Sequence, residues 1–252
     1  MTTGTAMHER QPIRAILFDL DGTLNGIDMD QFLPRYFAAL GEYLREWIEP
    51  QRLAREIWQA TESLLQDRDV ELTNAEKFRR RFLRDDPALR DLLYPLFDRF
   101  YEERFDALRS HAPIHPLARE AVETALDMGM RVVVATNPVF PEAAIRRRLA
   151  WAELADLPFQ FVTTMENSHA CKPHPEYFLE IVERLGVPPE HCLMVGNDRD
   201  EDLVAARLGM RTFWVTHLPI GRGISRVEPD GRGSLADLVA WLPGLARPDD
   251  GW

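Results

Sequence analysis

The sequence predicts an α/β fold in which a parallel sheet carries helices on both faces, together with a separate all-helical insertion. From residue 115 onward, short apolar runs typical of buried parallel strands alternate with amphipathic, helix-like segments. Residues 26–112 instead repeat apolar positions at helical spacing, without any strand pattern. The domains expected from this change of pattern are a core at 12–25 and 113–245, a helical domain at 26–112, and flexible tails at 1–11 and 246–252.

The first expected strand, at residues 13–18, ends in two carboxylates, Asp19 and Asp21, which are followed by Gly22 and Thr23. Side chains alternate faces along a strand, so the two carboxylates share a face only while the chain stays extended. Gly22 interrupts this regularity at the carboxyl end of the strand, where α/β sheets build their active sites. A nucleophilic carboxylate and a proton-carrying carboxylate near a metal ion suit phosphoryl transfer. Taken alone, the motif fits a strand with an acidic turn equally well.

The inserted segment is expected to form four amphipathic helices. Their apolar stripes lie near residues 33–47, 54–65, 73–82 and 89–100. Pro34 should lie in or before the first turn of its helix, and Pro95 should kink or break the last one. Thr73 and Glu76 predict a capping box at the start of the third helix.

After the insertion, strands and helices are expected to alternate. The predicted order is helix 117–128, strand 131–136, helix 141–152, strand 159–165, helix 174–185, strand 192–195, a helix from residue 201, strand 211–216 and helix 234–241. The Gly- and Pro-rich stretch 218–233 is expected to be a surface loop.

Three further polar groups follow in the order that an active site at the sheet edge needs. Thr136 and Asn137 end an apolar strand, and the helix that follows presents its amino terminus, which favours an anion. Lys172 stands next to a proline in front of another helix. The strand at 192–195 leads into an acidic cluster formed by Asp198, Asp200, Glu201 and Asp202. Each group alone could be structural, but together they assemble a nucleophile, a hydroxyl, a lysine and an acidic metal cradle.

These motifs resemble those of the haloacid dehalogenase superfamily, and specifically its Mg²⁺-dependent phosphatase branch. The matches, in chain order, are residues 19–23, Thr136 with Asn137, Lys172 with Pro173, and Asp198 with Asp202. In one departure, Asn197 is inserted before the aspartate of the last motif, so Asp200 and Glu201 compete as metal ligands. The resemblance covers residues 13–216 and implies a Rossmann-like core with a helical cap that closes over the site and selects the substrate.

The resemblance also implies a mechanism. Asp19 attacks phosphorus and becomes an aspartyl-phosphate, which splits one difficult step into two. Asp21 protonates the leaving oxygen and then deprotonates the hydrolytic water. Thr136, Asn137 and Lys172 bind the phosphoryl oxygens of the substrate, which is expected to be a small phosphorylated metabolite.

The same resemblance implies Mg²⁺ as the cofactor. Its expected ligands are Asp19, the backbone carbonyl of Asp21, and Asp198, with Asp202 in support. A phosphomutase of the superfamily shares every motif and stays an alternative, as does a non-catalytic binding protein that keeps the fold. A dehalogenase is disfavoured, because those relatives lack the second aspartate that Asp21 supplies.

Composition limits the partners. A net charge of -11 argues against a nucleic-acid or anionic-membrane surface. No segment has the length and hydrophobicity of a membrane span or of a signal peptide's apolar core. Two cysteines, Cys171 and Cys192, do not form a disulfide framework, so both are expected to be reduced thiols in a cytoplasmic protein. The sequence leaves open whether the protein is a monomer or a homodimer.

Several other residues are expected to be structural. The arginine triplets at 79–81 and 146–148 should lie on solvated helix faces. His111 and His115 should not form a metal pair, because Pro113 lies between them. His174 follows the lysine motif and is explained equally well by helix-start packing or by the site. Among the cap aromatics, the sequence assigns five to the core: Trp47, Trp58, Phe82, Tyr94 and Tyr101.

Overall fold

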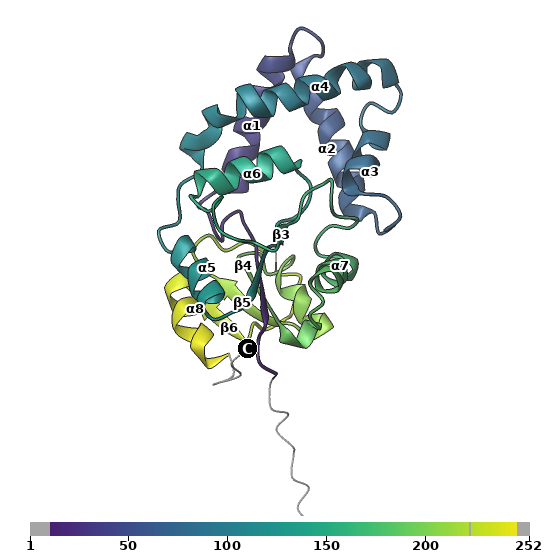
Figure 1. Ribbon diagram of the computed structural model, residues 1–252. Coiled ribbons are helices and arrows are strands. Elements are labelled where there is room, and N and C mark those ends of the chain that lie inside the picture. The colour runs from purple at the N-terminus through teal and green to yellow at the C-terminus, as the bar shows by residue number, and fades with distance from the viewer. Residues whose placement is uncertain (1–10, 222, 246–252) are drawn as a thin grey trace, which may run out of the picture.

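A computed structural model describes residues 11–221 and 223–245 of the chain. The expected tails at 1–11 and 246–252 therefore lie, except for Gln11, outside the described residues. Helices and strands form two lobes, one built around a parallel sheet and one from helices alone (Figure 1). The predicted α/β class with an inserted helical cap is confirmed.

The sheet has six parallel strands in the order β3-β2-β1-β4-β5-β6. They are β1 (Ala15–Phe18), β2 (Arg131–Val134), β3 (Phe161–Val162), β4 (Cys192–Gly196), β5 (Arg211–Val215) and β6 (Gly231–Gly233). The direction of winding reverses at β1, which pairs with β2 on one side and β4 on the other. Phe18 at the end of β1 is level with Val134 and Val195, so the residues after these three strands meet at one edge. Open α/β sheets bind their ligands at such a reversal.

Alternation along the strands produces an apolar layer on each face of the sheet. Ile16, Phe18 and Val132 belong to one buried cluster, whereas Leu17 and Val133 belong to another. Helices α5 (Ala118–Asp127), α6 (Glu142–Trp151) and α8 (Leu235–Trp241) contribute to the first cluster, and α7 (Pro175–Leu185) contributes to the second. The 3₁₀ helices η2 (Pro189–His191), η3 (Leu203–Leu208) and η4 (Leu242–Gly244) complete the lobe, and η1 (Phe105–His111) joins it to the helical insertion.

The cap consists of α1 (Met29–Leu44), α2 (Pro50–Gln66), α3 (Asn74–Arg81) and α4 (Pro87–Glu103), all between β1 and β2 (Figure 1). The predicted capping box of Thr73 and Glu76 is present. Pro34 lies in the second turn of α1 and not in the first, and α4 continues through Pro95 without a break. A proline removes one helical hydrogen bond, and here the tertiary packing of the two helices outweighs that loss.

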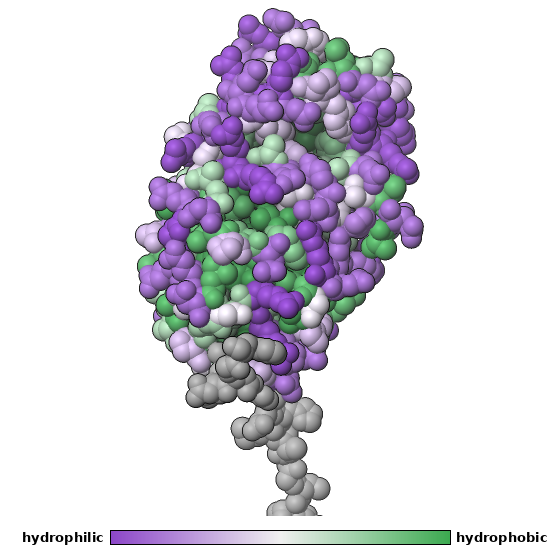
Figure 2. Space-filling model, in the orientation of Figure 1, coloured by the Kyte–Doolittle hydropathy of each residue, from purple (hydrophilic) through white to green (hydrophobic). Residues whose placement is uncertain are grey.

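On the face that Figure 2 shows, hydrophilic residues cover most of the cap end, and hydrophobic residues gather lower, over the sheet lobe. The cap aromatics that the sequence assigned to the core divide between two positions. Phe82 is fully buried, as predicted, but the prediction is wrong for Trp47 and Trp58, which are 41% and 58% exposed. Tyr101 belongs to the buried core, as predicted, and Tyr94 packs against that core; both also line a cavity, described below.

Three elements of the sheet lobe differ from the prediction. The strand expected at 159–165 forms only β3, because the chain then turns and its Thr163 hydroxyl donates to the Thr136 carbonyl at 2.7 Å. The helix expected from residue 201 is the 3₁₀ helix η3. The loop expected at 218–233 ends in strand β6, whose Gly231 packs so closely on Phe213 that a Cβ there would lie 2.6 Å from the ring. Two glycines in three residues carry no strand propensity, so β6 has no sequence signature.

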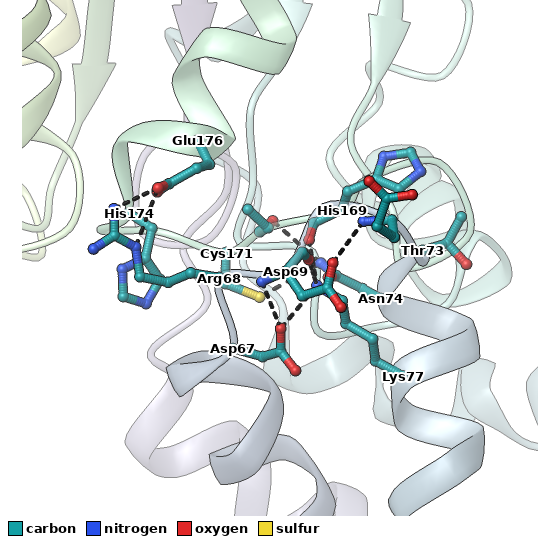
Figure 3. Close-up of polar contacts among 12 residues, drawn as sticks. Asp67, Arg68, Asp69, Thr73, Asn74, Lys77, His169, Cys171, His174 and Glu176 are labelled. Carbon is teal, nitrogen blue, oxygen red and sulfur yellow. Dashed lines mark hydrogen bonds and ion pairs between the residues drawn. The ribbon is translucent and has the colours of Figure 1, made fainter.

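The cap also contacts the segment that carries the site lysine, through a polar clamp formed by Asn74 and Lys77 (Figure 3). Lys77 Nζ donates to the His169 carbonyl at 2.6 Å and to the Asp69 carbonyl, and it is 3.3 Å from the Asp67 carboxylate. The Asn74 backbone N–H donates to the Ser168 carbonyl at 2.8 Å. Both clamp residues are buried, so this contact holds the cap against the core.

Two flanking contacts join the clamp. Arg68 pairs with Glu176 at the start of α7, with 3.1 Å between Nε and Oε1 (Figure 3). His174 Nε2 lies 2.8 Å from the Leu65 carbonyl at the end of α2. His174 therefore joins cap to core and does not enter the site. His115 likewise packs edge-on against His217, with 4.8 Å between ring centroids.

Candidate active site

A cavity of about 540 Å³ lies between the carboxyl edge of the sheet and the cap. Its floor is polar and is formed by residues that follow β1, β2 and β4. These floor residues are Asp19, Asp21, Thr136, Asn137, Asn197, Asp198, Glu201 and Asp202. The predicted site residues thus converge on one cavity, with Lys172 directly behind its floor.

Asp19 begins the floor at the end of β1. Its backbone N–H donates to the Val195 carbonyl at 2.8 Å, which extends the β1–β4 pairing by one residue. Its Oδ1 accepts a hydrogen bond from Lys172 Nζ at 2.8 Å, and its Oδ2 accepts one from Thr23 Oγ1 at 3.2 Å. The side chain is nearly buried but lines the cavity, so a fixed carboxylate faces whatever the cavity holds.

Lys172 lies between two carboxylates. Its Nζ is 2.8 Å from Asp19 Oδ1 and 2.6 Å from Asp202 Oδ1, and its side chain is 1% exposed. Burial by itself lowers the pKa of Lys172, but Asp19 and Asp202 raise it well above the ordinary value. The lysine is therefore a permanent cation beneath the floor.

Asp202 is fully buried and uses both of its oxygens. Besides the Lys172 contact, its Oδ2 accepts the backbone N–H of Asp198 at 2.9 Å. Burial raises the pKa of Asp202 to about 7, opposed by the Lys172 charge. The carboxylate lies so close to Gly196 that a Cβ there would be 2.0 Å from Oδ2, so only glycine fits at this end of β4. Asp202 thus orients Lys172 and the Asp198 loop.

The side chains of the other acidic residues in this cluster point in different directions. Asp198 accepts the backbone N–H groups of Asp200 and Glu201, at 2.7 and 3.1 Å, both through Oδ1. Burial raises the pKa of Asp198 above its ordinary value and that of Glu201 to about 7. Glu201 lines the cavity and accepts Asn137 Nδ2 at 2.9 Å. Asp200 turns to the neighbouring loop, where it accepts the Ser225 N–H at 2.7 Å, so of the two competing ligands only Glu201 faces the cavity.

The side chain of the inserted Asn197 contacts the turn at Gly22 and Thr23. Its Oδ1 accepts Thr23 Oγ1 at 3.3 Å, and its Nδ2 donates to the Leu218 carbonyl. Gly22 has a φ of +78°, and a Cβ on it would lie 2.3 Å from Asn197 Nδ2. Asn197 therefore holds the turn at Gly22 and Thr23, directly after the two carboxylates, and Asp198 faces the cavity.

Asp21 is paired with an arginine that the sequence placed on a solvated helix face. Arg148 Nη1 donates to Asp21 Oδ2, and Asn25 Nδ2 donates to Asp21 Oδ1 at 2.9 Å. The Arg148 side chain is 1% exposed, and its guanidinium lies 4.4 Å from the Phe140 ring centroid. Burial raises the pKa of Asp21, and the Arg148 charge opposes that rise. The prediction is therefore wrong for Arg148.

The neighbours of Arg148 reach solvent, as predicted: Arg146 is exposed and pairs with Glu142, and Arg147 is partly exposed and pairs with Asp106. Arg148 differs because its position on α6 continues the buried face of Ala144 and Ile145, at helical spacing. This helical spacing is the feature of the sequence that could have identified Arg148 as buried. Two of its nitrogens, Nε and Nη2, are buried without a partner among the described residues.

The floor suits a hard divalent cation in its donor chemistry. Asp19, Asp198 and Glu201 offer carboxylate oxygens, the ligands that Mg²⁺ prefers. Burial raises the pKa values of Asp198 and Glu201, although the Lys172 charge lowers both in part. Across the described ranges, however, no three carboxylate, imidazole or thiol side chains already converge closely enough to hold a metal ion. An ion would have to draw the Asp198 loop and Asp19 together.

Residues 13–209 match the haloacid dehalogenase-like hydrolase family. The chain belongs to this family. Among curated members it is 26% identical over 237 residues to the pyrophosphatase PpaX of Anoxybacillus flavithermus, covering 93% of this chain and 99% of that protein. It is 25% identical over 261 residues to the phosphoglycolate phosphatase of Escherichia coli, covering 96% of each.

Solved structures of the haloacid dehalogenase-like hydrolases share the fold across different activities. A 2-haloacid dehalogenase from Pseudomonas syringae pv. tomato is 25% identical, with a TM-score of 0.64 over 93% of this chain and 100% of that one. A phosphatase from Thermococcus onnurineus is 21% identical, with a TM-score of 0.59 over 94% and 100%. The hydrolase YfnB of Bacillus subtilis, 19% identical with a TM-score of 0.54 over 92% and 99%, was solved bound to magnesium. Within the described part of this chain, no helix combines the length and hydrophobicity needed to cross a bilayer.

Proposed function

We propose that this hydrolase is a Mg²⁺-dependent phosphatase that cleaves a small phosphate monoester through an aspartyl-phosphate on Asp19. The observation that supports it most is that two carboxylates, Asp19 and Asp21, line the same cavity floor. Asp19 is fixed by Lys172 and Thr23, and Asp21 lines the same floor two residues later. A nucleophile and a separate proton carrier are what phosphoester hydrolysis by a covalent route requires.

In the proposed reaction, a carboxylate oxygen of Asp19 forms a bond to phosphorus as the ester P–O bond breaks. Asp21 gives a proton to the departing oxygen. It then takes a proton from the water whose oxygen attacks phosphorus, which releases inorganic phosphate and restores Asp19. Lys172 holds the Asp19 carboxylate and offers positive charge to the transferring group, while Thr136 and Asn137 line the floor beside it.

Mg²⁺ would be held by Asp19, the backbone carbonyl of Asp21, and Asp198, and when bound it offsets the repulsion between an anionic nucleophile and an anionic substrate. Asp202 would support this set indirectly, because its oxygens hold Lys172 and the backbone of Asp198. Glu201 faces the cavity and could complete the ligand set.

A 2-haloacid dehalogenase is the second candidate, because a solved dehalogenase shares 25% identity and the fold. Asp21 counts against it, since displacement of halide by a carboxylate needs no proton donor for the leaving group.

One experiment separates the two candidates. Purified protein is offered p-nitrophenyl phosphate and acetyl phosphate, or 2-chloropropionate, each with Mg²⁺ and with a chelator, and phosphate and halide are measured. We expect phosphate release only with Mg²⁺, none from Asp19→Asn, and no halide. Halide release without metal, or phosphate release that survives chelation, would overturn the proposal. Product analysis with a phosphorylated sugar distinguishes an isomerised sugar, the product of a phosphomutase, from free phosphate.

A further inference from the structure

The walls of the cavity differ sharply from its floor. Aromatic side chains from all four cap helices line it, among them Phe37, Trp58, Phe78, Tyr94 and Phe97. Ligand pockets of about 300–1,000 Å³ enclose most of a drug-sized molecule, and this cavity of about 540 Å³ falls in that range. A two-carbon phosphate ester would leave most of these apolar walls in contact with water.

The charges around the cavity all have one sign. Away from the floor its charged residues are Asp30, Asp98 and Glu166, and among the described residues no lysine or arginine lines it. The buried cations Lys172 and Arg148 do not line the cavity and pair with floor carboxylates, while Nε and Nη2 of Arg148 have no partner among the described residues. A second carboxylate or phosphate on the substrate would therefore meet acidic groups and no cation on the cavity lining, at a cost in binding.

Apart from these three carboxylates, the polar groups on the walls are mainly tyrosine hydroxyls. The hydroxyls of Tyr36 and Tyr101 share one hydrogen bond of 2.8 Å, in which one donates and the other accepts. The Tyr94 hydroxyl is buried without a hydrogen-bond partner among the described residues. Arg79 lies over the Tyr94 ring, 4.8 Å from its centroid, but the guanidinium pairs with Asp91 and does not line the cavity. Apart from the three carboxylates, the wall thus offers mainly apolar and aromatic surface.

A contact between cap and core holds the apolar wall of the cavity in place. The clamp residues Asn74 and Lys77 fix α3 to the segment before Lys172 (Figure 3). Phe78 and Ala75 of the same helix line the cavity. The clamp therefore holds an apolar wall over the catalytic floor.

We infer that the substrate is the phosphate monoester of an uncharged, apolar alcohol of about the size of one or two rings, without a second anionic group. This inference rests on the proposed phosphatase function and specifies its substrate class. The aromatic wall binds the alcohol and the floor binds the phosphate. The acidic wall residues Asp30, Asp98 and Glu166 repel substrates with a second anionic group, such as phosphoglycolate.

The test compares esters whose leaving groups are alkyl alcohols of similar reactivity: ethyl phosphate, benzyl phosphate, 4-carboxybenzyl phosphate and phosphoglycolate, each with wild-type protein and Mg²⁺. We expect kcat/KM for benzyl phosphate to exceed that for ethyl phosphate by roughly 10- to 100-fold, the worth of burying one ring. Carboxylation of the ring should lower kcat/KM at least tenfold. Equal or better use of phosphoglycolate or 4-carboxybenzyl phosphate would overturn the inference.

Two cap tryptophans provide a matched pair of variants. Trp58 lines the cavity and is 58% exposed, whereas Trp47 is 41% exposed and is not among the cavity-lining residues, so neither replacement removes a buried core side chain. Trp58→Ala should reduce the benzyl-over-ethyl preference severalfold, and Trp58→Arg should raise the relative use of the carboxylated ester. Trp47→Ala should leave both ratios unchanged.

The failure of this inference and of the proposed function give different results. Release of phosphate from p-nitrophenyl phosphate and acetyl phosphate without any preference for apolar esters would contradict the substrate class alone. Absence of Mg²⁺-dependent release from every ester in the panel, with folded wild-type protein, would contradict both. Identical ester ratios in wild type, Trp58→Ala and Trp58→Arg would show that this wall does not contact the substrate.

Discussion

Arg148→Met tests whether the buried arginine neutralises Asp21. The change keeps most of the apolar volume and removes the charge, so Asp21 keeps only the Asn25 amide as its side-chain partner. Breaking a buried ion pair from one side costs about 3–5 kcal/mol, and the lost contact with the Phe140 ring adds about 1 kcal/mol. The substitution also removes the buried, unpartnered Nε and Nη2 groups, which stabilises the folded protein by about 1–3 kcal/mol. We therefore expect a net loss of about 3 kcal/mol in the free energy of unfolding.

The assay is urea unfolding of wild type, Arg148→Met, Asp21→Asn and the double variant, all metal-free. The double variant should be more stable than Arg148→Met, because the remaining partner is then neutral. Burial raises the folded-state pKa of Asp21 above its unfolded value, so stability from this group falls as pH rises. Without Arg148 the rise in pKa is larger, and the deficit of Arg148→Met should shrink between pH 8 and pH 5. A loss below about 1 kcal/mol, or no coupling in the double variant, would refute the ion-pair account.

Three further predictions concern the chemistry, the acidic floor and the clamp. Asp21→Asn should slow turnover of an alkyl phosphate by roughly 10²- to 10⁴-fold, measured as steady-state phosphate release; near-normal rates would mean that another group carries the proton. Burial raises the pKa of Glu201 from its ordinary value of 4.5 to about 7, so the stability of the metal-free protein should fall as pH rises from about 5 to 7. Thermal unfolding of Glu201→Gln should depend less on pH over that range; identical slopes would contradict this. Lys77→Met should destabilise the protein by about 3 kcal/mol in urea unfolding, because the Lys77 side chain is 2% exposed and its loss leaves its buried partners unsatisfied. The matched control is Arg79→Met, on the exposed side of the same helix, which should change stability by under about 1 kcal/mol.

The sequence was sufficient where local pattern and tertiary structure agree. Strands β1, β2 and β4 are apolar runs that lie in the centre of the sheet, and their polar ends mark the floor of the site. Register then brings those ends level, so Asp19, Thr136 and Asp198 line one cavity. The order of motifs along the chain thus predicted a convergence that the parallel pairing provides.

The sequence was insufficient where the partner of a residue comes from a distant part of the chain. A run of three arginines is typical of a solvated face, and only the helical phase of α6 separates Arg148 from its neighbours. Strand β6 is specified by the close approach of Gly231 to Phe213 and not by its own propensity. Aromatic residues in the cap follow the same spacing whether they fill a core, as Phe82 does, or line a cavity, as Phe97 does. Such differences depend on the space between elements.

The most direct test of the central claim is detection of phosphorylated Asp19. Wild type and Asp21→Asn are mixed with Mg²⁺ and acetyl phosphate, quenched with acid at times shorter than one turnover, and analysed by peptide mass spectrometry. The account predicts one phosphoryl group on the peptide that contains Asp19, accumulating further in Asp21→Asn because the second step needs its base, and absent from Asp19→Asn. Phosphate release by wild type without any adduct at Asp19, or an adduct on another residue, would contradict it.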